Sequence, residues 1–241
     1  MSAERSTVVL VHGAWGGSWC WERVVPLLEE RGVRSLTVDL PSVGGDPGEP
    51  PDLSADAAAV GRVLDGAGGT FVVCGHSYGG MVVTVAAAGR SDVVHLVYLC
   101  AFMPDAGESL FTLTGGPAPW IELLEDGRTL PDLERAAAVG YADCDEKTRA
   151  RAVARLRPQV TAPFAETVAT AAWREIPATY VVCTDDQSLP VDLQRDVFAP
   201  RAREVVELAS GHSPFFSQPE RVAELLVERA RGSAFHAQPP M

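Results

Sequence analysis

Along the first hundred residues, short apolar runs rich in β-branched side chains alternate with longer runs that mix apolar and polar residues. The short runs predict strands at residues 7–11, 33–38, 70–74 and 93–99. The longer runs predict helices at residues 18–31 (with Ser18 as N-cap), 54–65 and 81–88. Strands that alternate with helices are typical of a parallel sheet covered by helices on both faces.

The alternation stops after Cys100. Residues 103–175 contain no run that predicts a strand, and helical patterns occur instead at 120–126, 133–141, 146–157 and 165–173. Strands are again expected at 178–183 and 203–208, and helices at 191–198 and 218–231. We therefore predict an α/β fold with a mostly parallel sheet in residues 1–102 and 176–231, and an inserted, non-autonomous helical cap in residues 103–175. Residues 232–241 are expected to be a mobile tail.

The composition is that of an ordinary globular protein, with 46% hydrophobic and 22% charged residues. The formal net charge of −12 argues against nucleic acid or an anionic membrane surface as partner. No run is long and apolar enough to span a bilayer, and no signal peptide is apparent. The five cysteines show no metal-ligand spacing. We expect a cytoplasmic protein with reduced cysteines and without metal or cofactor. The sequence leaves the oligomeric state open, and a homodimer is one candidate.

A glycine-flanked serine follows the third predicted strand and precedes a predicted helix, in the sequence Gly75-His76-Ser77-Tyr78-Gly79. This is the G-x-S-x-G pattern in the strand–turn–helix context of a nucleophile elbow. The turn is too tight for side chains beside the serine, so the Ser77 hydroxyl is pushed out above the sheet. Ser77 is therefore a candidate nucleophile. The alternative interpretation is a glycine-rich turn with an idle serine.

A serine nucleophile needs a histidine base, and in sheets of this kind the chain order is serine, acid, histidine. His212 follows the last predicted strand and is the histidine whose position meets that order. The other histidines are better explained in other ways. They lie in a glycine turn, beside the serine, within an apolar strand and in the tail, at His12, His76, His95 and His236.

The acid is expected in the loop after residues 178–183, where Asp185 and Asp186 are adjacent. Neighbouring side chains that leave a strand point in opposite directions, so one of the two can reach the histidine. We favour Asp186. Alternation does not determine which of the two side chains points toward the histidine, so Asp185 stays an alternative. Asp105 is a third, weaker candidate.

Ester chemistry also needs two backbone N–H groups that stabilise an oxyanion. Tyr78 supplies the first, because it follows the nucleophile at the start of a helix. Ala14, in the loop after the first strand, is expected to supply the second, because Gly13 permits an unusual backbone path there.

The sequence resembles the α/β-hydrolase superfamily over essentially its whole length, and within it the small esterase and hydroxynitrile lyase group, which includes plant methyl-salicylate-type esterases and many bacterial hydrolases. The segments that carry the resemblance are residues 11–15 with Trp19 and Trp21, residues 99–104 and residues 211–214. The resemblance implies a sheet of about six strands under a helical cap, and a mostly apolar pocket. It also supports Asp186, because the acid in this group lies a few residues before a proline, here Pro190.

Two departures from the lyases of this group favour ester hydrolysis. The lyases resembling this protein have a threonine where Gly13 lies and a lysine where Ser213 lies. The single lysine, Lys147, falls in the predicted cap and does not replace it. A serine nucleophile also differs from the aspartate of related dehalogenases and epoxide hydrolases.

The expected substrate is a small to medium hydrophobic or aromatic ester, including a methyl ester or a lactone. Residues that are candidates for the pocket are Trp15, Phe102, Met103, Phe111, Trp120 and Trp173. Two other functions stay open: a lyase, cyclase or acyltransferase that uses the same site, and a ligand-binding receptor with a vestigial triad.

Overall fold

The strand β1 (Thr7–Val11) is buried along its whole length in the computed structural model, which describes residues 6–232. Its side chains divide between the two faces of a sheet, because successive residues of a strand point in opposite directions. Val9 and Val11 belong to one apolar cluster, and Val8 and Leu10 belong to the other. A strand that is apolar on both sides requires helices on both faces.

All six strands of the main sheet are parallel, in the order β2-β1-β3-β4-β8-β9. The prediction of a parallel α/β sheet of about six strands is confirmed. The remaining strands of this sheet are β2 (Ser35–Val38), β3 (Phe71–His76), β4 (Val93–Leu99), β8 (Ala178–Cys183) and β9 (Glu204–Leu208).

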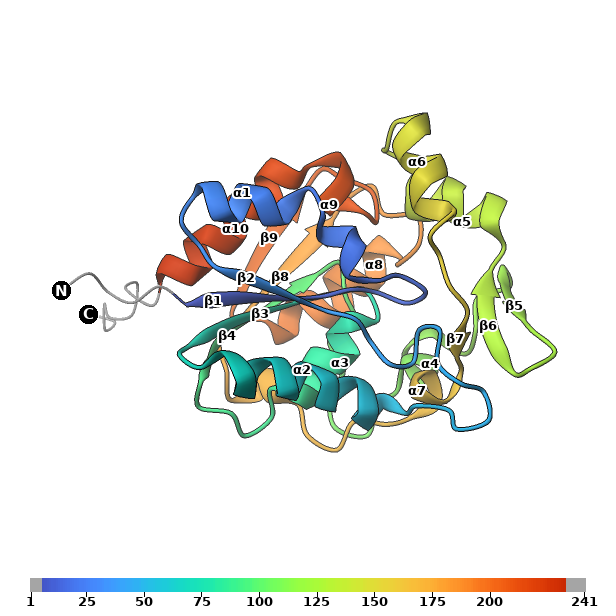
Figure 1. Cartoon of the computed structure of the whole chain (residues 1–241), viewed down its shortest axis with the longest axis horizontal. Helices are drawn as coiled ribbons and strands as arrows, with labels where there is room; N and C mark the ends of the chain where they lie inside the picture. Colours follow the sequence, from blue (N-terminus) through green and yellow to red (C-terminus); the bar gives the residue numbers. More distant parts are fainter. Residues whose placement is uncertain (1–5, 233–241) are drawn as a thin grey trace.

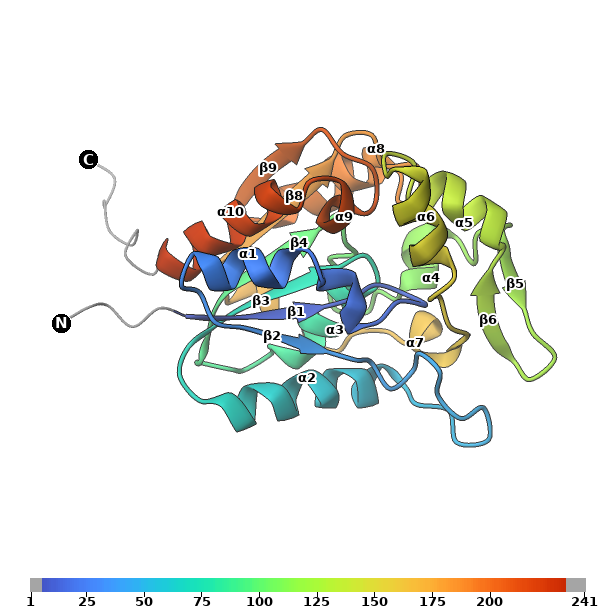
Figure 2. The same ribbon diagram turned by 45° about the horizontal axis from the view of Figure 1, so that its top comes forward.

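Helices cover both faces of the sheet, as Figure 2 shows. One face carries α1 (Val24–Glu30), α9 (Pro214–Ser217) and α10 (Pro219–Arg231), and the other carries α2 (Leu53–Ala67) and α3 (Gly79–Ala86). After β8 the chain passes through α8 (Val191–Leu193), a π-helical turn η3 (Gln194–Phe198) and η4 (Ala199–Arg201). Each apolar face of the sheet is thus closed by its own set of helices.

The single helix predicted for residues 18–31 is wrong, because the chain forms a short 3-10 helix η1 (Ser18–Trp21) before α1. Pro26 lies in the first turn of α1, where its missing N–H is tolerated, whereas inside a longer helix it would break the hydrogen-bond ladder. Ser18 does not cap a helix: its hydroxyl and its backbone N–H both donate to the Asp39 carboxylate.

The inserted segment, residues 103–175, which we call the cap, contains helices and also three short strands. Its helical elements are α4 (Leu110–Thr114), α5 (Leu133–Gly140), α6 (Glu146–Val153), α7 (Ala162–Ala165) and η2 (Ala172–Arg174). An antiparallel sheet is formed by β5 (Ile121–Leu123), β6 (Arg128–Pro131) and β7 (Gln159–Val160). The expectation of a cap without strands is therefore wrong.

The helix predicted for residues 120–126 is a β-hairpin. Gly127 has φ 81° at the turn, and Leu124 N–H donates to the Arg128 carbonyl at 2.8 Å. An Asp-Gly pair between apolar runs is a strong hairpin signal, and Asp126-Gly127 is such a pair. The helix predicted for residues 165–173 is wrong as well, because α7 ends at Ala165 and η2 begins at Ala172.

The cap lies at the end of the sheet away from the start of β1 and the end of α10 (Figure 1). Its return strand β7 contacts the loop after β2, where Val43 forms a bridge with Gln159. In the part of the chain that the structure describes, no helix combines the length and apolar character needed to span a membrane. Apart from Gly232, the tail predicted to be mobile lies outside the described residues.

Candidate active site

The turn at Ser77 has the close backbone packing that a nucleophile elbow requires. Ser77 has φ 51°, a left-handed conformation that side chains other than glycine rarely adopt. A Cβ on Gly75 would lie 2.6 Å from the Gly79 carbonyl oxygen, and a Cβ on Gly79 would lie 2.6 Å from the His12 oxygen. The flanking glycines therefore allow the turn, and Ser77 lines a cavity beneath the cap.

His212 and Asp186 form a buried hydrogen-bonded pair after the last two strands. His212 Nδ1 lies 2.7 Å from Asp186 Oδ2, and the two residues are 8% and 6% exposed. Since a carboxylate accepts, Nδ1 carries the proton in the neutral imidazole and Nε2 is an acceptor. His212 and Ser77 line the same cavity. No hydrogen bond joins the Ser77 hydroxyl to His212 within residues 6–232, and such bonds often form only with substrate bound.

The Asp186 carboxylate is held in place by several donors. Its Oδ1 accepts from the backbone N–H groups of Ser188 and Leu189, at 2.8 and 2.9 Å, and Oδ2 also accepts from Gln194 Nε2 at 2.9 Å. Asp185 is exposed, and its backbone N–H donates to the Ser210 carbonyl. Of the two adjacent aspartates, the structure brings Asp186 to His212.

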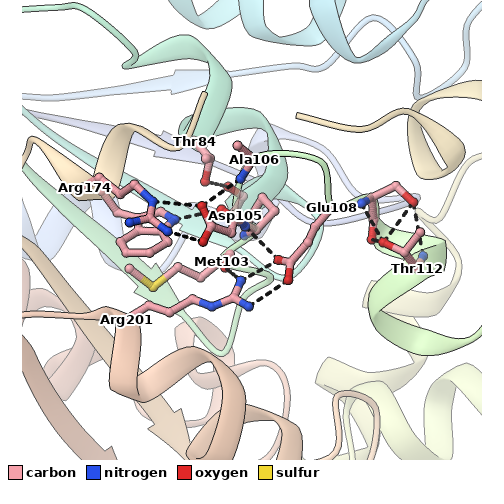
Figure 3. A network of polar contacts seen from close by, with 12 residues as sticks. Thr84, Met103, Asp105, Ala106, Glu108, Thr112, Arg174 and Arg201 are labelled. Carbon is pink, nitrogen blue, oxygen red and sulfur yellow. Dashed lines mark hydrogen bonds and ion pairs between the residues drawn. The ribbon is translucent and has the colours of Figure 1, made fainter. Parts of the chain in front are cut away.

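Asp105 belongs to a separate polar network, which Figure 3 shows. The Arg174 guanidinium donates to both of its carboxylate oxygens, with an Nε–Oδ1 distance of 2.9 Å, and holds the pKa of Asp105 below its usual value. Arg201 binds Glu108 and the Met103 carbonyl in the same network. This network joins the start of the cap, at Asp105 and Glu108, to the end of the cap at Arg174 and to Arg201 in η4. Asp105 is not bonded to His212.

His76 lies behind the candidate base and supports its backbone. His76 Nε2 donates to the His212 carbonyl at 2.8 Å, and the Cys100 thiol contacts the same carbonyl at 3.5 Å. Burial lowers the pKa of His76 well below its usual value, so this ring is neutral. In the described residues, His76, Cys100 and His212 are the group whose geometry could hold a metal ion. The contacts of His76 and Cys100 with the His212 carbonyl account for this clustering.

His12 fixes the loop that carries Ala14. Its Nε2 accepts from the Leu40 N–H at 3.1 Å, so Nδ1 carries the proton and donates to the Gly13 carbonyl at 2.8 Å. Burial lowers the pKa of His12 to about 4. Because a trans peptide directs its C=O and N–H to opposite sides, the bond to the Gly13 carbonyl also sets the direction of the Ala14 N–H.

Tyr78 precedes the first residue of α3, where backbone N–H groups have no partner inside the helix. Its side chain is fully buried, and its hydroxyl donates to Asp56 Oδ2 at 2.7 Å. This buried anchor fixes the residue whose N–H is the first candidate oxyanion donor.

The cavity has a volume of about 70 Å³ and is largely apolar in its lining residues. Trp15 and Trp120, both proposed from the sequence, line it and pack edge to face with ring centroids 6.0 Å apart. Other lining residues come from the cap and from the His212 loop, and sequence reasoning missed them: Pro131, Ala136, Val139, Tyr141, Leu156 and Phe215. The helical patterns over residues 133–141 and 146–157 include some of these positions, but they did not indicate that the side chains face a pocket.

The other four candidate pocket residues are not among the residues that line this cavity. Phe102 packs on Phe198 in the core, and Phe111 packs on Phe164. Met103 is fully buried, and the Trp173 indole donates to the Pro104 carbonyl at 2.7 Å. These four residues pack in the core or between the cap and the core, and a role for them in the pocket stays a prediction.

Comparison with known proteins identifies the family. The sequence model of the Alpha/beta hydrolase family matches residues 8–225. A pyrethroid hydrolase from Sphingobium wenxiniae is 32% identical over 253 residues, which cover 96% of this chain and 90% of that protein. Methylesterase 9 from Arabidopsis thaliana is 28% identical over 248 residues, with 92% and 97% covered. The crystal structure of a pyrethroid hydrolase from Sphingobium faniae has a TM-score of 0.83, at 30% identity, and the match covers 96% of this chain and 99% of that one. The chain therefore belongs to the alpha/beta hydrolase family.

Proposed function

We propose that this protein is a serine carboxylesterase that cleaves its substrate through an acyl-enzyme on Ser77. The observation that carries the proposal is the buried His212–Asp186 pair, 2.7 Å between Nδ1 and Oδ2, on the cavity that Ser77 also lines. A histidine whose Nδ1–H is bound by a carboxylate presents Nε2 as the base for a serine hydroxyl.

In the proposed reaction, His212 Nε2 takes the proton of the Ser77 hydroxyl while Oγ bonds to the ester carbonyl carbon. Asp186 stabilises the imidazolium that forms. The carbonyl electrons move to oxygen, and the Ala14 and Tyr78 N–H groups stabilise that oxyanion. The intermediate then expels the alcohol, which takes the proton from His212. Water, deprotonated by His212, adds to the acyl carbon, and the second intermediate then breaks its bond to Ser77 Oγ, which takes the proton from His212 as the acid leaves.

The proposed substrate is a small to medium hydrophobic or aromatic ester, such as a methyl ester or a lactone. The apolar, aromatic lining of the cavity supports this class. Relatives described as a pyrethroid hydrolase and a methylesterase support an ester substrate.

Two local features favour hydrolysis over cyanohydrin cleavage. A Cβ on Gly13 would lie 2.9 Å from the Ser77 Cβ, so the threonine of the lyases has no room there without a shift. Ser213, at the lyase lysine position, donates its hydroxyl to the Gly140 carbonyl at 2.7 Å. Neither position therefore supplies a group for cyanide.

The test is a panel of 4-nitrophenyl and methyl esters assayed with the wild type and Ser77→Ala. We expect Ser77→Ala to lose about 10⁴- to 10⁶-fold in turnover, because triad members act as a unit. Ser54→Ala, an exposed serine on α2, is the matched control and should keep full activity. Retention of near-wild-type hydrolysis by Ser77→Ala would overturn the proposal.

The same panel separates the alternatives. Cleavage of cyanohydrins, or ester formation with an added alcohol, would indicate lyase or acyltransferase chemistry. Tight binding of a ligand without reaction of Ser77 with a fluorophosphonate would indicate a receptor. The division into a core and a non-autonomous cap, a cytoplasmic location and a homodimeric state are further proposals that rest on the sequence.

A further inference from the structure

The loop that carries Ala14 contains an unfavourable backbone conformation. Gly16 N–H bonds to the Gly13 carbonyl at 3.4 Å, which closes a β-turn, and Trp15 at the third position has φ 57°. Turns with a positive φ at this position favour glycine or asparagine. A tryptophan in the left-handed region costs about 1–2 kcal/mol, so surrounding contacts must hold it there.

The return segment of the cap provides those contacts on both sides of Trp15. Arg157 N–H donates to the Trp15 carbonyl at 2.9 Å, and the Trp15 N–H donates to Gln159 Oε1 at 2.9 Å. The cap segment is itself fixed to the core, because Val160 N–H donates to the Ser42 carbonyl at 3.0 Å. Both backbone polar groups of the strained residue are thus bound by the cap.

The other end of the Gln159 amide leads to Tyr78, the other candidate oxyanion residue. Gln159 Nε2 donates to the Ser42 hydroxyl at 2.9 Å, and that hydroxyl donates to Asp56 Oδ2 at 2.5 Å. The Tyr78 hydroxyl donates to the same carboxylate oxygen at 2.7 Å. Gln159, Ser42, Asp56 and Tyr78 are all 0% exposed. One buried chain of hydrogen bonds therefore joins the cap, the Trp15 peptide and the anchor of Tyr78.

We propose that Gln159 is a positioning residue that couples the seating of the cap to the geometry of the oxyanion hole. With the cap seated, Gln159 holds Trp15 in its left-handed conformation and supports the Ser42–Asp56–Tyr78 chain. Without this contact, the Ala14–Trp15 peptide relaxes and shifts the adjoining Gly13–Ala14 peptide, so the two N–H donors lose their common orientation. This inference rests on the proposed esterase function.

The test compares Gln159→Met with Thr161→Val. Methionine matches glutamine in length but removes both amide contacts. Thr161, two residues after Gln159, donates its hydroxyl to the Gly127 carbonyl at 2.9 Å, so Thr161→Val removes a cap hydrogen bond that involves neither Trp15 nor Gln159. Three readouts are used: amide hydrogen exchange of residues 12–17, the kinetics of 4-nitrophenyl butyrate hydrolysis, and inhibition by 2,2,2-trifluoroacetophenone, which forms an oxyanion adduct with a serine.

For Gln159→Met we expect about tenfold faster exchange of the Trp15 amide, because its acceptor is lost. We expect kcat to fall about 10- to 50-fold, less than the 10²–10³ of a deleted oxyanion donor, with KM within about twofold. Trifluoroacetophenone should bind weaker by the same factor as kcat falls. Thr161→Val should match the wild type within about threefold in all three readouts.

Gln159 is proposed to hold the Trp15 backbone, and we call this contact the clamp. Unchanged amide exchange at Trp15 in Gln159→Met would overturn the clamp, even if the protein proved not to be an esterase. Faster exchange with an unchanged kcat, or a change in KM alone, would overturn the coupling to the oxyanion hole. A wild type that does not hydrolyse esters through Ser77 would contradict the proposed function, whereas the exchange measurement still decides the clamp.

Discussion

The sheet core and the cap differ in the interactions that stabilise them. The core is closed by two large apolar clusters, with side chains such as Val9, Leu28 and Leu226 fully buried. In the cap, α4 has no buried residue and β5 is half-buried or exposed. Other cap residues, such as Phe164 and Tyr141, belong to the two apolar clusters. The cap is bound in addition by directional polar contacts, and several of these reach the loops of the candidate site.

Those polar contacts lie on both sides of the site. Gln159 binds the loop of Ala14, as described above. The Asp143 carboxylate accepts from the Gly211 N–H at 2.8 Å and from the Ser210 hydroxyl at 3.0 Å, directly before His212. Hydrophobic burial, which is not directional, stabilises the core, whereas the hydrogen bonds of the cap fix positions. The comparison implies that core changes affect stability and cap changes affect turnover.

The largest expected effect on stability comes from the core. Leu28→Ala on α1 removes a fully buried side chain and should lower the free energy of unfolding by about 2–5 kcal/mol. The kcat per folded molecule should stay within about twofold of wild type, because Leu28 is not among the residues that line the cavity. Urea unfolding and active-site titration measure the two quantities. A large fall in kcat with little loss of stability would break the comparison.

His12 lies where the core meets the site, and it makes stability depend on pH. Its pKa is about 4 in the folded protein, so between pH 6.5 and 4 the unfolded chain binds the proton and the folded one does not. The stability that His12 contributes is present above pH 6.5 and is lost as the pH falls, by about 3 kcal/mol at pH 4.

The matched variant for this effect is His12→Asn. It keeps a donor for the Gly13 carbonyl and removes the titrating ring. Urea unfolding at several pH values should give a shallower loss of stability for the variant than for the wild type between pH 6.5 and 4. Equal slopes would show that His12 does not carry this pH dependence.

The smallest expected effect in free energy concerns the other cap contact. Asp143→Ala leaves the Gly211 N–H without its acceptor and should lower kcat about tenfold, equivalent to about 1.4 kcal/mol. Asp143→Asn keeps a carbonyl oxygen for that N–H and should retain most of the activity. Kinetics with 4-nitrophenyl butyrate and thermal unfolding separate the effects. If Asp143→Ala lowered the thermal stability but left kcat unchanged, the expectation that cap contacts affect turnover would be contradicted for the loop before His212.

The strands of the core could be predicted from the sequence because their apolar, β-branched runs are continuous. The bounds of β1, β4 and β8 match the expected residues. The strands of the cap were missed because β5 and β7 contain three and two residues, too few to show a period.

The site was predictable to different degrees for different residues. Ser77 and His212 follow from motif and chain order. The sequence alone did not decide between Asp185 and Asp186. The Asp186 carboxylate is held by the N–H groups of Ser188 and Leu189, and the alternating direction of side chains along a strand does not reveal these contacts. Gln159 gave no signal, because its partners Trp15 and Ser42 are far away in the chain and are brought close by the folded cap.

The five cysteines are all free and buried, which makes the protein a convenient host for a single reporter group. Burial raises the pKa of Cys20 and of Cys144 to about 12, and thiols in this state react slowly with maleimides. Leu123, on the β5 hairpin of the cap, is 72% exposed. A fluorophore attached through Leu123→Cys would therefore label the cap alone, and its signal would report on the surroundings of the β5 hairpin with and without substrate.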